Sequence, residues 1–209
     1  MHSNMTNIVL ALDSGSIDLI GPLLKSIKNN VKDYNIIIIT DNEITVDECT
    51  VIVKDAPWKS KYARITGHTY YRLFLDEWLD VDKCIYLDFD TLVLDDISEL
   101  LDGDDWMLKV SGVEDKYFNA GVLAFNFTDE CRSLMSECRK LLEETDYDDQ
   151  HILNTVFKGK FSNVGTEYNV SGNRCHQVVC EPKILHFIGT QKPWHVSPYY
   201  KYYLQYKDE

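Results

Sequence analysis

One stretch of the sequence, residues 84–94, constrains the fold of this chain more than any other. It is a largely apolar run that contains Asp88 and Asp90, two carboxylates separated by one residue. Such runs are typical of buried strands in α/β proteins, where helices cover both faces of the sheet. In extended backbone, side chains two residues apart point to the same side. Because ligands of open α/β sheets bind beyond the carboxyl ends of the strands, this pair is a candidate site for a divalent cation.

The D-x-D spacing is informative only because of where it occurs. The chain contains 22 aspartates, so chance alone gives roughly two such triplets. Four are present, and the triplet at Asp88 is the one that directly follows an apolar strand pattern. The others lie among polar residues and are interpreted as solvated loop or cap carboxylates: they are Asp80/Asp82, Asp102/Asp104 and Asp146/Asp148.

Length and charge restrict the class of protein. With 209 residues, the chain can bury a substantial core, and we expect one domain over residues 1–209. The net charge of −13 argues against nucleic acid or an anionic membrane as a partner, because Lys and Arg drive phosphate binding. No apolar run is long enough to form a transmembrane segment, and residues 1–6 lack the apolar region of a signal peptide. We therefore expect a cytoplasmic protein.

The six cysteines do not form a recognisable metal or redox motif. None belongs to a C-x-x-C pair, and Cys84 lies within the predicted buried strand. Free thiols are the favoured interpretation, and zinc is not expected. Cys175 and Cys180 are the best candidates for a disulfide.

The first third of the chain predicts a parallel sheet. Strands are expected at residues 7–12, 36–39 and 50–53, with a helix at 17–27 after the first of them. This strand–helix–strand order is typical of a sheet covered by helices. Neither G-x-G-x-x-G nor G-x-x-x-x-G-K-[ST] occurs, so a dinucleotide fold of the NAD type and a P-loop are unsupported. The turn after the first strand, residues 13–16, remains a natural place for a nucleotide.

The remaining elements follow from periodicity and capping residues. A helix over residues 59–79 is the strongest helical prediction, and it carries Lys61, Arg64 and Arg72. Helices are also expected from the Thr128 cap to Glu144 and at 150–157. Further strands are expected at 106–110, in the apolar part of 117–126 and at 183–187, with a tyrosine-rich surface segment at 199–206.

Several polar residues stand out at the ends of these elements. Arg72 could reach a diphosphate or orient a carboxylate, whereas Lys61 and Arg64 are interpreted as partners of surface acids. Small residues beside Asn119 would let a ligand approach the backbone, and an amide can bind hydroxyls. Gly189 and Lys192 suggest a phosphate-binding site, because a glycine backbone N–H and a lysine ammonium can both bind phosphate oxygens. Asp149 and Gln150 open a helix, where acidic caps are common, and a lone His186 at a strand end is commonly structural.

Taken together, these segments resemble glycosyltransferase family 8, the glycogenin-like retaining transferases, including compact viral and bacterial members. The resemblance covers nearly the whole chain in order. Its motifs are Tyr70-Tyr71-Arg72-Leu73, Tyr86-Leu87-Asp88-Phe89-Asp90-Thr91, Phe118-Asn119-Ala120-Gly121-Val122, Asp149-Gln150 and the stretch from His186 to Trp194. The resemblance implies the GT-A fold, an α/β domain with a Rossmann-like half and a mixed central sheet.

The resemblance also implies ligands and roles. The donor would be a UDP-sugar, the acceptor a glycan or other hydroxyl, and the cation Mn²⁺, with Mg²⁺ as the alternative. The implied metal ligands are Asp88, Asp90 and His186. The implied nucleotide contacts are Ala11, Leu12, Asp13, Gly189 and Lys192. The donor sugar would lie against Arg72, Asn119, Ala120 and Asp149, with Gln150 on its β face; Gln150 and Asp149 are the candidate catalytic residues.

Two departures from the family pattern limit what carries over. The segment between Asp90 and Asn119 is shorter than in typical members, so the resemblance does not imply which acceptor is used. The chain also ends soon after the Lys192-Pro193-Trp194 corner, which is consistent with a minimal enzyme or with one domain of a longer transferase.

Two alternative functions remain open from the sequence. Residues 88–93 also fit the D-x-D-x-[TV] motif of haloacid-dehalogenase-type Mg²⁺ phosphatases, with Asp88 as nucleophile and Asp90 as acid/base. That motif usually lies on the first strand, whereas three predicted strands precede it here. The second alternative is a non-catalytic module that binds a nucleotide sugar.

Overall fold

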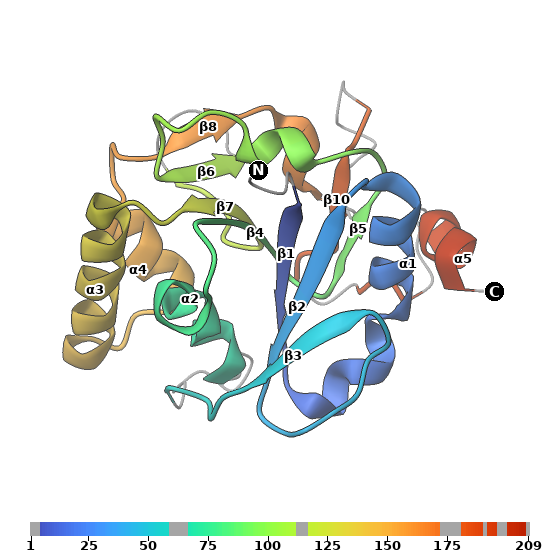
Figure 1. Ribbon diagram of the computed structural model, residues 1–209, viewed down its shortest axis with the longest axis horizontal. Coiled ribbons are helices and arrows are strands. Elements are labelled where there is room, and N and C mark those ends of the chain that lie inside the picture. Colours follow the sequence, from blue (N-terminus) through green and yellow to red (C-terminus); the bar gives the residue numbers. More distant parts are fainter. Residues whose placement is uncertain are drawn as a thin grey trace.

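The computed structural model describes residues 5–58, 67–111, 117–171, 181–189, 192–195 and 200–207. A seven-stranded sheet runs through its centre, with helices on both faces (Figure 1). The strand order is β3-β2-β1-β4-β7-β6-β8. Strands β1 to β4 pair in parallel, whereas β7 is antiparallel to both β4 and β6. The sheet is therefore mixed, as expected.

The strands are β1 (Thr6–Ala11), β2 (Tyr34–Thr40), β3 (Cys49–Val53), β4 (Lys83–Leu87), β5 (Thr91–Val93), β6 (Leu108–Ser111), β7 (Val122–Asn126), β8 (Ser162–Val164), β9 (Val170–Ser171) and β10 (Ile184–His186). The α-helices are α1 (Gly21–Asn30), α2 (Leu75–Trp78), α3 (Asp129–Glu144), α4 (Asp149–Val156) and α5 (Tyr200–Lys207). Short 3₁₀ helices are η1 (Ser14–Leu19), η2 (Gly67–Leu73), η3 (Ser98–Leu101) and η4 (Thr166–Asn169).

Alternation along the central strands divides the core between the two faces of the sheet. In β1, Val9 packs in a cluster with residues of α3 and α4, whereas Ile8 and Leu10 pack with residues of α1. The isoleucines of β2 alternate in the same way, because successive side chains of a strand point to opposite faces. Consecutive apolar residues are therefore buried on both faces, which explains why the strands read as continuous apolar runs.

A second, three-stranded sheet in the order β5-β10-β9 adjoins the central sheet. Residues 84–94 therefore form two strands in two sheets, β4 and β5, joined by a turn that contains Asp88 and Asp90. α5 packs over this region with Tyr203 and Tyr206, and the Tyr206 hydroxyl accepts a hydrogen bond from Asn30 of α1 (3.1 Å). The predicted tyrosine-rich surface segment is thus a helix over its described residues.

The predicted long helix at 59–79 is wrong for its described part. Residues 59–66, including Lys61 and Arg64, lie outside the described residues, and the rest forms η2 followed by the single turn α2. Tyr70, Tyr71, Arg72 and Leu73 are all buried, so this segment does not have the solvated face of an amphipathic helix. Arg139 of α3 holds it in place, donating to the carbonyl of Leu73 (2.7 Å) and to Asp76 Oδ1 (2.6 Å).

Other predicted details are confirmed or need small corrections. Thr128 caps α3 by accepting from the backbone N–H of Cys131, and Leu142 completes the buried face of that helix. Asp148, not Asp149, caps α4. Cys49, Cys84, Cys131 and Cys138 are free thiols, whereas Cys175 and Cys180 lie outside the described residues. No helix in the described ranges is both long and apolar enough to span a bilayer.

Candidate functional site

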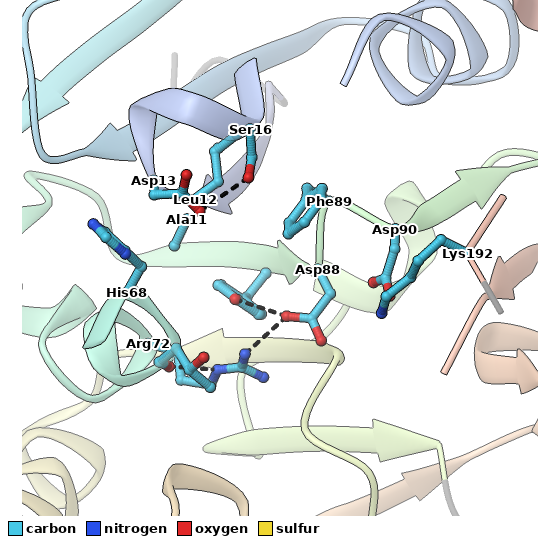
Figure 2. Close-up of a pocket in the computed structure, with 12 residues that line it drawn as sticks. Ala11, Leu12, Asp13, Ser16, His68, Arg72, Asp88, Phe89, Asp90 and Lys192 are labelled. Atoms are coloured by element: carbon cyan, nitrogen blue, oxygen red, sulfur yellow. Dashed lines mark hydrogen bonds and ion pairs between the residues drawn. The ribbon is translucent and has the colours of Figure 1, made fainter. Parts of the chain in front are cut away.

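The candidate site lies beyond the carboxyl ends of β1 and β4, where an open α/β sheet binds its ligands (Figure 2). A cavity of about 330 Å³ opens there. The residues lining it come from the turn after β1, from η2, from the end of β4 and its following turn, and from Lys192. They are Ala11, Leu12, Asp13, Ser16, His68, Thr69, Arg72, Tyr86, Asp88, Phe89, Asp90 and Lys192.

Three of the predicted ligands meet at one edge of this cavity. Asp88, Asp90 and His186 each offer a ligand atom, and these atoms lie within 4.8 Å of one another. His186 Nε2 is 3.5 Å from Asp88 Oδ2 and 3.4 Å from Asp90 Oδ1. His186 and Asp90 are buried, whereas the Asp88 side chain is 25% exposed and faces the cavity.

Strand pairing explains why these residues meet. β4 ends at Leu87, and the chain turns through Asp88 and Asp90 before β5 begins. The turn is closed by Thr91, whose hydroxyl donates to the Asp88 carbonyl (2.8 Å). β5 then pairs antiparallel with β10 in a register that places Thr91 opposite His186. The backbone N–H of Phe187 donates to the Asp90 carbonyl (3.0 Å), which fixes β10 against the turn.

Neighbouring groups orient both carboxylates. Asp88 Oδ1 accepts from Arg72 Nη2 (2.8 Å) and from the Tyr86 hydroxyl (2.9 Å), which leaves Oδ2 on the His186 side. Asp90 Oδ2 pairs with Lys192 Nζ, which leaves Oδ1 on the His186 side. Each aspartate therefore has one oxygen held by a protein donor and the other turned toward the imidazole.

The cluster fits a divalent cation in both chemistry and space. Two carboxylate oxygens and one imidazole nitrogen are a donor set that suits Mn²⁺. Burial opposes ionisation of Asp90, but the positive charges of a protonated His186 and of Lys192 outweigh burial and lower the pKa of Asp90 to about 2. Gly121 lies against the cluster, and a Cβ atom there would overlap the His186 ring and lie 2.6 Å from Asp88 Oδ2. Only glycine leaves the ligands in their present positions.

Arg72 links this cluster to a second cavity. Its guanidinium is buried, bonds Asp88, and places Nε 3.0 Å from Asp149 Oδ2. It also donates to the carbonyl oxygens of Ala120 and Thr69 and lies 4.5 Å from the centre of the Tyr86 ring. Burial disfavours the charged form of Arg72, but the carboxylates of Asp88 and Asp149 raise its pKa above the usual value. Arg72 is thus a permanent cation between two acids.

The second cavity, of about 190 Å³, adjoins the first. Both are lined by Thr69, Arg72 and Asp88. The second adds five residues from the loop before β7 and from the start of α4: Asn119, Gly121, Asp148, Asp149 and Gln150. Asp149 is buried there, and burial raises its pKa to about 6 despite the opposing effect of Arg72.

Hydrogen bonds tie the loop before β7 to α4. Gln150 Oε1 accepts from Asn119 Nδ2 and from the backbone N–H of Ala120, both at 3.0 Å. Asn154, one turn further along α4, exchanges two hydrogen bonds with the backbone of Phe118. The predicted donor-sugar residues Arg72, Asn119, Ala120 and Asp149 are therefore brought together with Gln150.

The structure places most of the predicted nucleotide contacts around the first cavity. Ala11, Leu12, Asp13 and Lys192 line it, whereas Gly189, which has a positive φ of 86°, does not. Sequence reasoning gave no ligand contact to His68, Thr69, Tyr86 or Phe89, which also line this cavity. Ser16 belongs to the turn at 13–16 that was predicted as a place for a nucleotide, but nothing in the sequence singled out His68, whose Nε2 lies 3.5 Å from Asp41 Oδ2.

Comparisons with known proteins connect this geometry to one family. The family model described as "Glycosyl transferase family 8" matches residues 104–197, a range that contains Asn119, Asp149 and His186 but not Asp88 or Asp90. Glycosyltransferase GlyE of Streptococcus pneumoniae is 30% identical over 163 residues, which cover 66% of this chain and 39% of GlyE. Human Glycogenin-2 is 30% identical over 134 residues, which cover 57% of this chain and 26% of the relative. The chain thus spans well under half the length of these relatives.

A solved structure establishes the fold. The galactosyltransferase LgtC, crystallised with donor and acceptor sugar analogs, superposes with a TM-score of 0.78 at 23% identity, covering 98% of this chain and 97% of LgtC. The likeness extends over nearly the whole of both chains, and the expected GT-A fold is confirmed.

Proposed function

The chain belongs to glycosyltransferase family 8, and from that membership we propose that it moves a hexose from a UDP-sugar to a carbohydrate hydroxyl, with retention of configuration and with Mn²⁺ as cation. One observation carries the proposal: two adjoining cavities share Arg72 and Asp88, and the Asp88–Asp90–His186 cluster lies at their boundary. A donor with a nucleotide half and a sugar half, joined by a diphosphate, matches this division. The proposed acceptor is a glycan or another hydroxyl compound.

The first cavity suits the nucleotide half. Phe89 offers an aromatic face and Asp13 a carboxylate for ribose or base, while Lys192 lies at the end near Asp90. The second cavity suits the sugar half, because Asp149, Asn119 and Gln150 supply groups that bind hydroxyls. Asp88, Asp90 and His186 would hold the cation, which supplies Lewis-acid stabilisation of the charge that develops on the leaving diphosphate.

The residues favour transfer without a protein nucleophile. Gln150 Oε1 already accepts two hydrogen bonds, and an amide oxygen is a poor nucleophile. Asp149 is the alternative, but Arg72 binds its carboxylate at 3.0 Å. In the front-face route, the bond from the anomeric carbon to the diphosphate oxygen breaks and its electron pair stays on that oxygen. The acceptor oxygen bonds to the same face of the carbon, and its proton passes to the departing phosphate.

The test is a panel of UDP-sugars with Mn²⁺, scored by donor hydrolysis and by thermal shift. A ligand at 100 times its Kd stabilises the folded state by roughly 2.7 kcal/mol, so a true donor is readily seen. We expect the shift to disappear with EDTA and in Asp90→Asn. The matched control is Asp82→Asn, which alters an exposed carboxylate of another D-x-D triplet and should respond as wild type does.

The outcomes separate the candidate functions. If EDTA leaves a UDP-induced shift unchanged, the metal assignment is wrong. Mg²⁺-dependent hydrolysis of phosphate monoesters without UDP would support the phosphatase instead. A metal-dependent shift without donor hydrolysis or transfer to any glycan in an acceptor screen would support a binding module. A stable glycosyl adduct on Asp149 would overturn the front-face route.

A further inference from the structure

We propose that Asn169 is a positioning residue that fixes the tautomer of His186, with its proton on Nδ1 and the lone pair of Nε2 turned toward Asp88 and Asp90. Asn169 lies at the end of η4, directly before β9, and sequence reasoning gave no signal for it. Its amide is one link in a chain of side-chain amides that runs from Gln150 to His186. The proposal rests on the proposed function only in that His186 is taken to bind a divalent cation.

The chain of amides begins at two backbone N–H groups, which can only donate. The N–H of Ala120 points at Gln150 (3.0 Å), so the Gln150 atom that receives it is the oxygen Oε1. The N–H of Gly121 points at Asn119 (3.0 Å), so the Asn119 atom that receives it is Oδ1. Asn119 therefore presents its NH₂ group to Gln150 Oε1, at 3.0 Å. The backbone thus determines how both amides are oriented.

The orientation of Asn119 then determines that of Asn169. Asn119 Oδ1 faces Asn169 at 3.1 Å, and an oxygen requires a donor opposite it. Asn169 therefore presents Nδ2 to Asn119, which leaves Oδ1 toward the imidazole. The reverse orientation would bring two acceptor oxygens to 3.1 Å and would place two donors opposite each other if Nδ1 kept its proton.

The orientation of Asn169 in turn determines the state of His186. Asn169 Oδ1 lies 2.9 Å from His186 Nδ1, so Nδ1 must carry the proton. In the neutral ring, Nε2 is then unprotonated, and Nε2 is the atom that faces both aspartates. A metal-ligating histidine generally donates its other N–H to a fixed acceptor, and loss of that acceptor costs about ten- to hundredfold in metal affinity.

The series of linked amides also connects the Asp88–Asp90–His186 cluster to the second cavity. Asn119 and Gln150 line that cavity, and Asn169 connects them to a ligand of the cluster through directed hydrogen bonds. His186 is 3% exposed, so solvent has little access with which to replace the Asn169 contact. Asn169 therefore positions both the His186 ring and the Asn119 amide, although it lines neither described cavity.

Two substitutions divide these roles. Asn169→Ala removes both hydrogen bonds, whereas Asn169→Asp keeps an acceptor for His186 Nδ1–H and loses the donor to Asn119. The matched control is Asn35→Ala. Asn35 is half-buried like Asn169 and donates to the Asn7 side chain (3.2 Å), but it lies at the amino end of β2, at the opposite end of the strands from the site. Thermal unfolding and circular dichroism check that each variant is folded.

The first measurement needs neither metal nor donor. Long-range ¹H–¹⁵N NMR of the metal-free protein, at the alkaline end of the imidazole titration, reports which ring nitrogen carries the proton, and His186→Gln assigns the signals. We expect a protonated Nδ1 at His186 in wild type, Asn35→Ala and Asn169→Asp, and a tautomer mixture in Asn169→Ala. A protonated Nε2 in the wild-type protein would overturn the proposal.

The second measurement is the affinity for Mn²⁺ in the absence of nucleotide, determined from the electron paramagnetic resonance signal of the free ion. We expect Asn169→Ala to weaken binding about ten- to hundredfold, and Asn169→Asp to recover most of the loss. With an active donor, Asn169→Asp should still show a reduced kcat, because Asn119 has lost its donor. Wild-type Mn²⁺ affinity in Asn169→Ala would overturn the proposal. If the tautomer is as expected but no UDP-sugar is turned over, the proposed function fails while the positioning role stands.

Discussion

Gly121 lies directly against His186, so closely that any side chain at position 121 would occupy space now held by the imidazole ring. The contact exists because β7 follows immediately on the loop that crosses the end of β4, and the backbone N–H of Asp88 donates to the Gly121 carbonyl (2.8 Å). The glycine thus lies against the Asp88–Asp90–His186 cluster and leaves room for its side chains.

Gly121→Ala should therefore damage the cluster selectively. Overpacking of a close-packed region costs about 1–3 kcal/mol of unfolding free energy. Displacing His186 should also weaken Mn²⁺ binding by more than about tenfold, a loss comparable to removal of a ligand's supporting contact. Calorimetry with Mn²⁺ and urea denaturation measure both. Gly21→Ala is the control: nothing lies within 4 Å of a Cβ atom there, so metal affinity should not change. Unchanged affinity in Gly121→Ala would contradict the steric argument.

Much of this site was predictable because strand ends are visible in the sequence. The apolar run before Asp88 predicts β4, the central strand of the sheet, and ligands of open α/β sheets bind beyond the carboxyl ends of such strands. The turn after β1 was predicted for the same reason, and Ala11, Leu12 and Asp13 line the cavity. The apolar pattern of a strand and the polar residues at its end are local features, so they can be recognised in the sequence without knowing the fold.

What the sequence did not reveal depends on contacts between distant segments. Asn169 touches His186 and Asn119 only because β9 pairs with β10 and η4 packs near the loop before β7. The described part of the predicted long helix forms η2 instead, because Arg72 is held by Asp88, Asp149 and two carbonyl groups. This tertiary network outweighs the local helix propensity. The cap of α4 was assigned to Asp149, but Asp148 takes that place because Asp149 pairs with Arg72.

Gln150→Ala should slow transfer while leaving the donor bound. The substitution leaves the Ala120 N–H and the Asn119 amide without their acceptor, and an unsatisfied buried donor costs about 1–3 kcal/mol. We expect kcat to fall at least about tenfold, with donor Kd changed by less than about threefold. Gln150→Glu is the matched control because it keeps an acceptor for both donors. Steady-state kinetics and thermal shift separate the effects; an equal loss in Kd would show that Gln150 binds rather than positions.

Arg72→Lys should abolish donor binding even though it preserves the charge. An ammonium group cannot reproduce the guanidinium's contacts with Asp88, Asp149 and the carbonyl of Ala120. Breaking a buried charge network of this kind costs about 3–5 kcal/mol. The control is Arg132→Lys, because Arg132 also donates to backbone carbonyls, those of Phe127 and Asp76, but lines neither cavity. Arg132→Lys should lose stability and keep the UDP-sugar thermal shift. If Arg72→Lys binds the donor as tightly as wild type does, the several directed contacts of the guanidinium are not needed for binding.

Asp149 should make the stability of the metal-free protein depend on pH. Burial raises its pKa from 3.8 to about 6, so between these values the unfolded chain loses the proton before the folded protein does. The wild type is therefore destabilised as the pH rises through this window, by up to about 3 kcal/mol. Asp149→Asn lacks this ionisation, so its unfolding free energy relative to wild type should increase by that amount between about pH 4 and about pH 7. Urea denaturation in EDTA at both pH values measures the difference. An advantage of Asp149→Asn that is constant, or largest at the lower pH, would mean that the Arg72 contact outweighs burial.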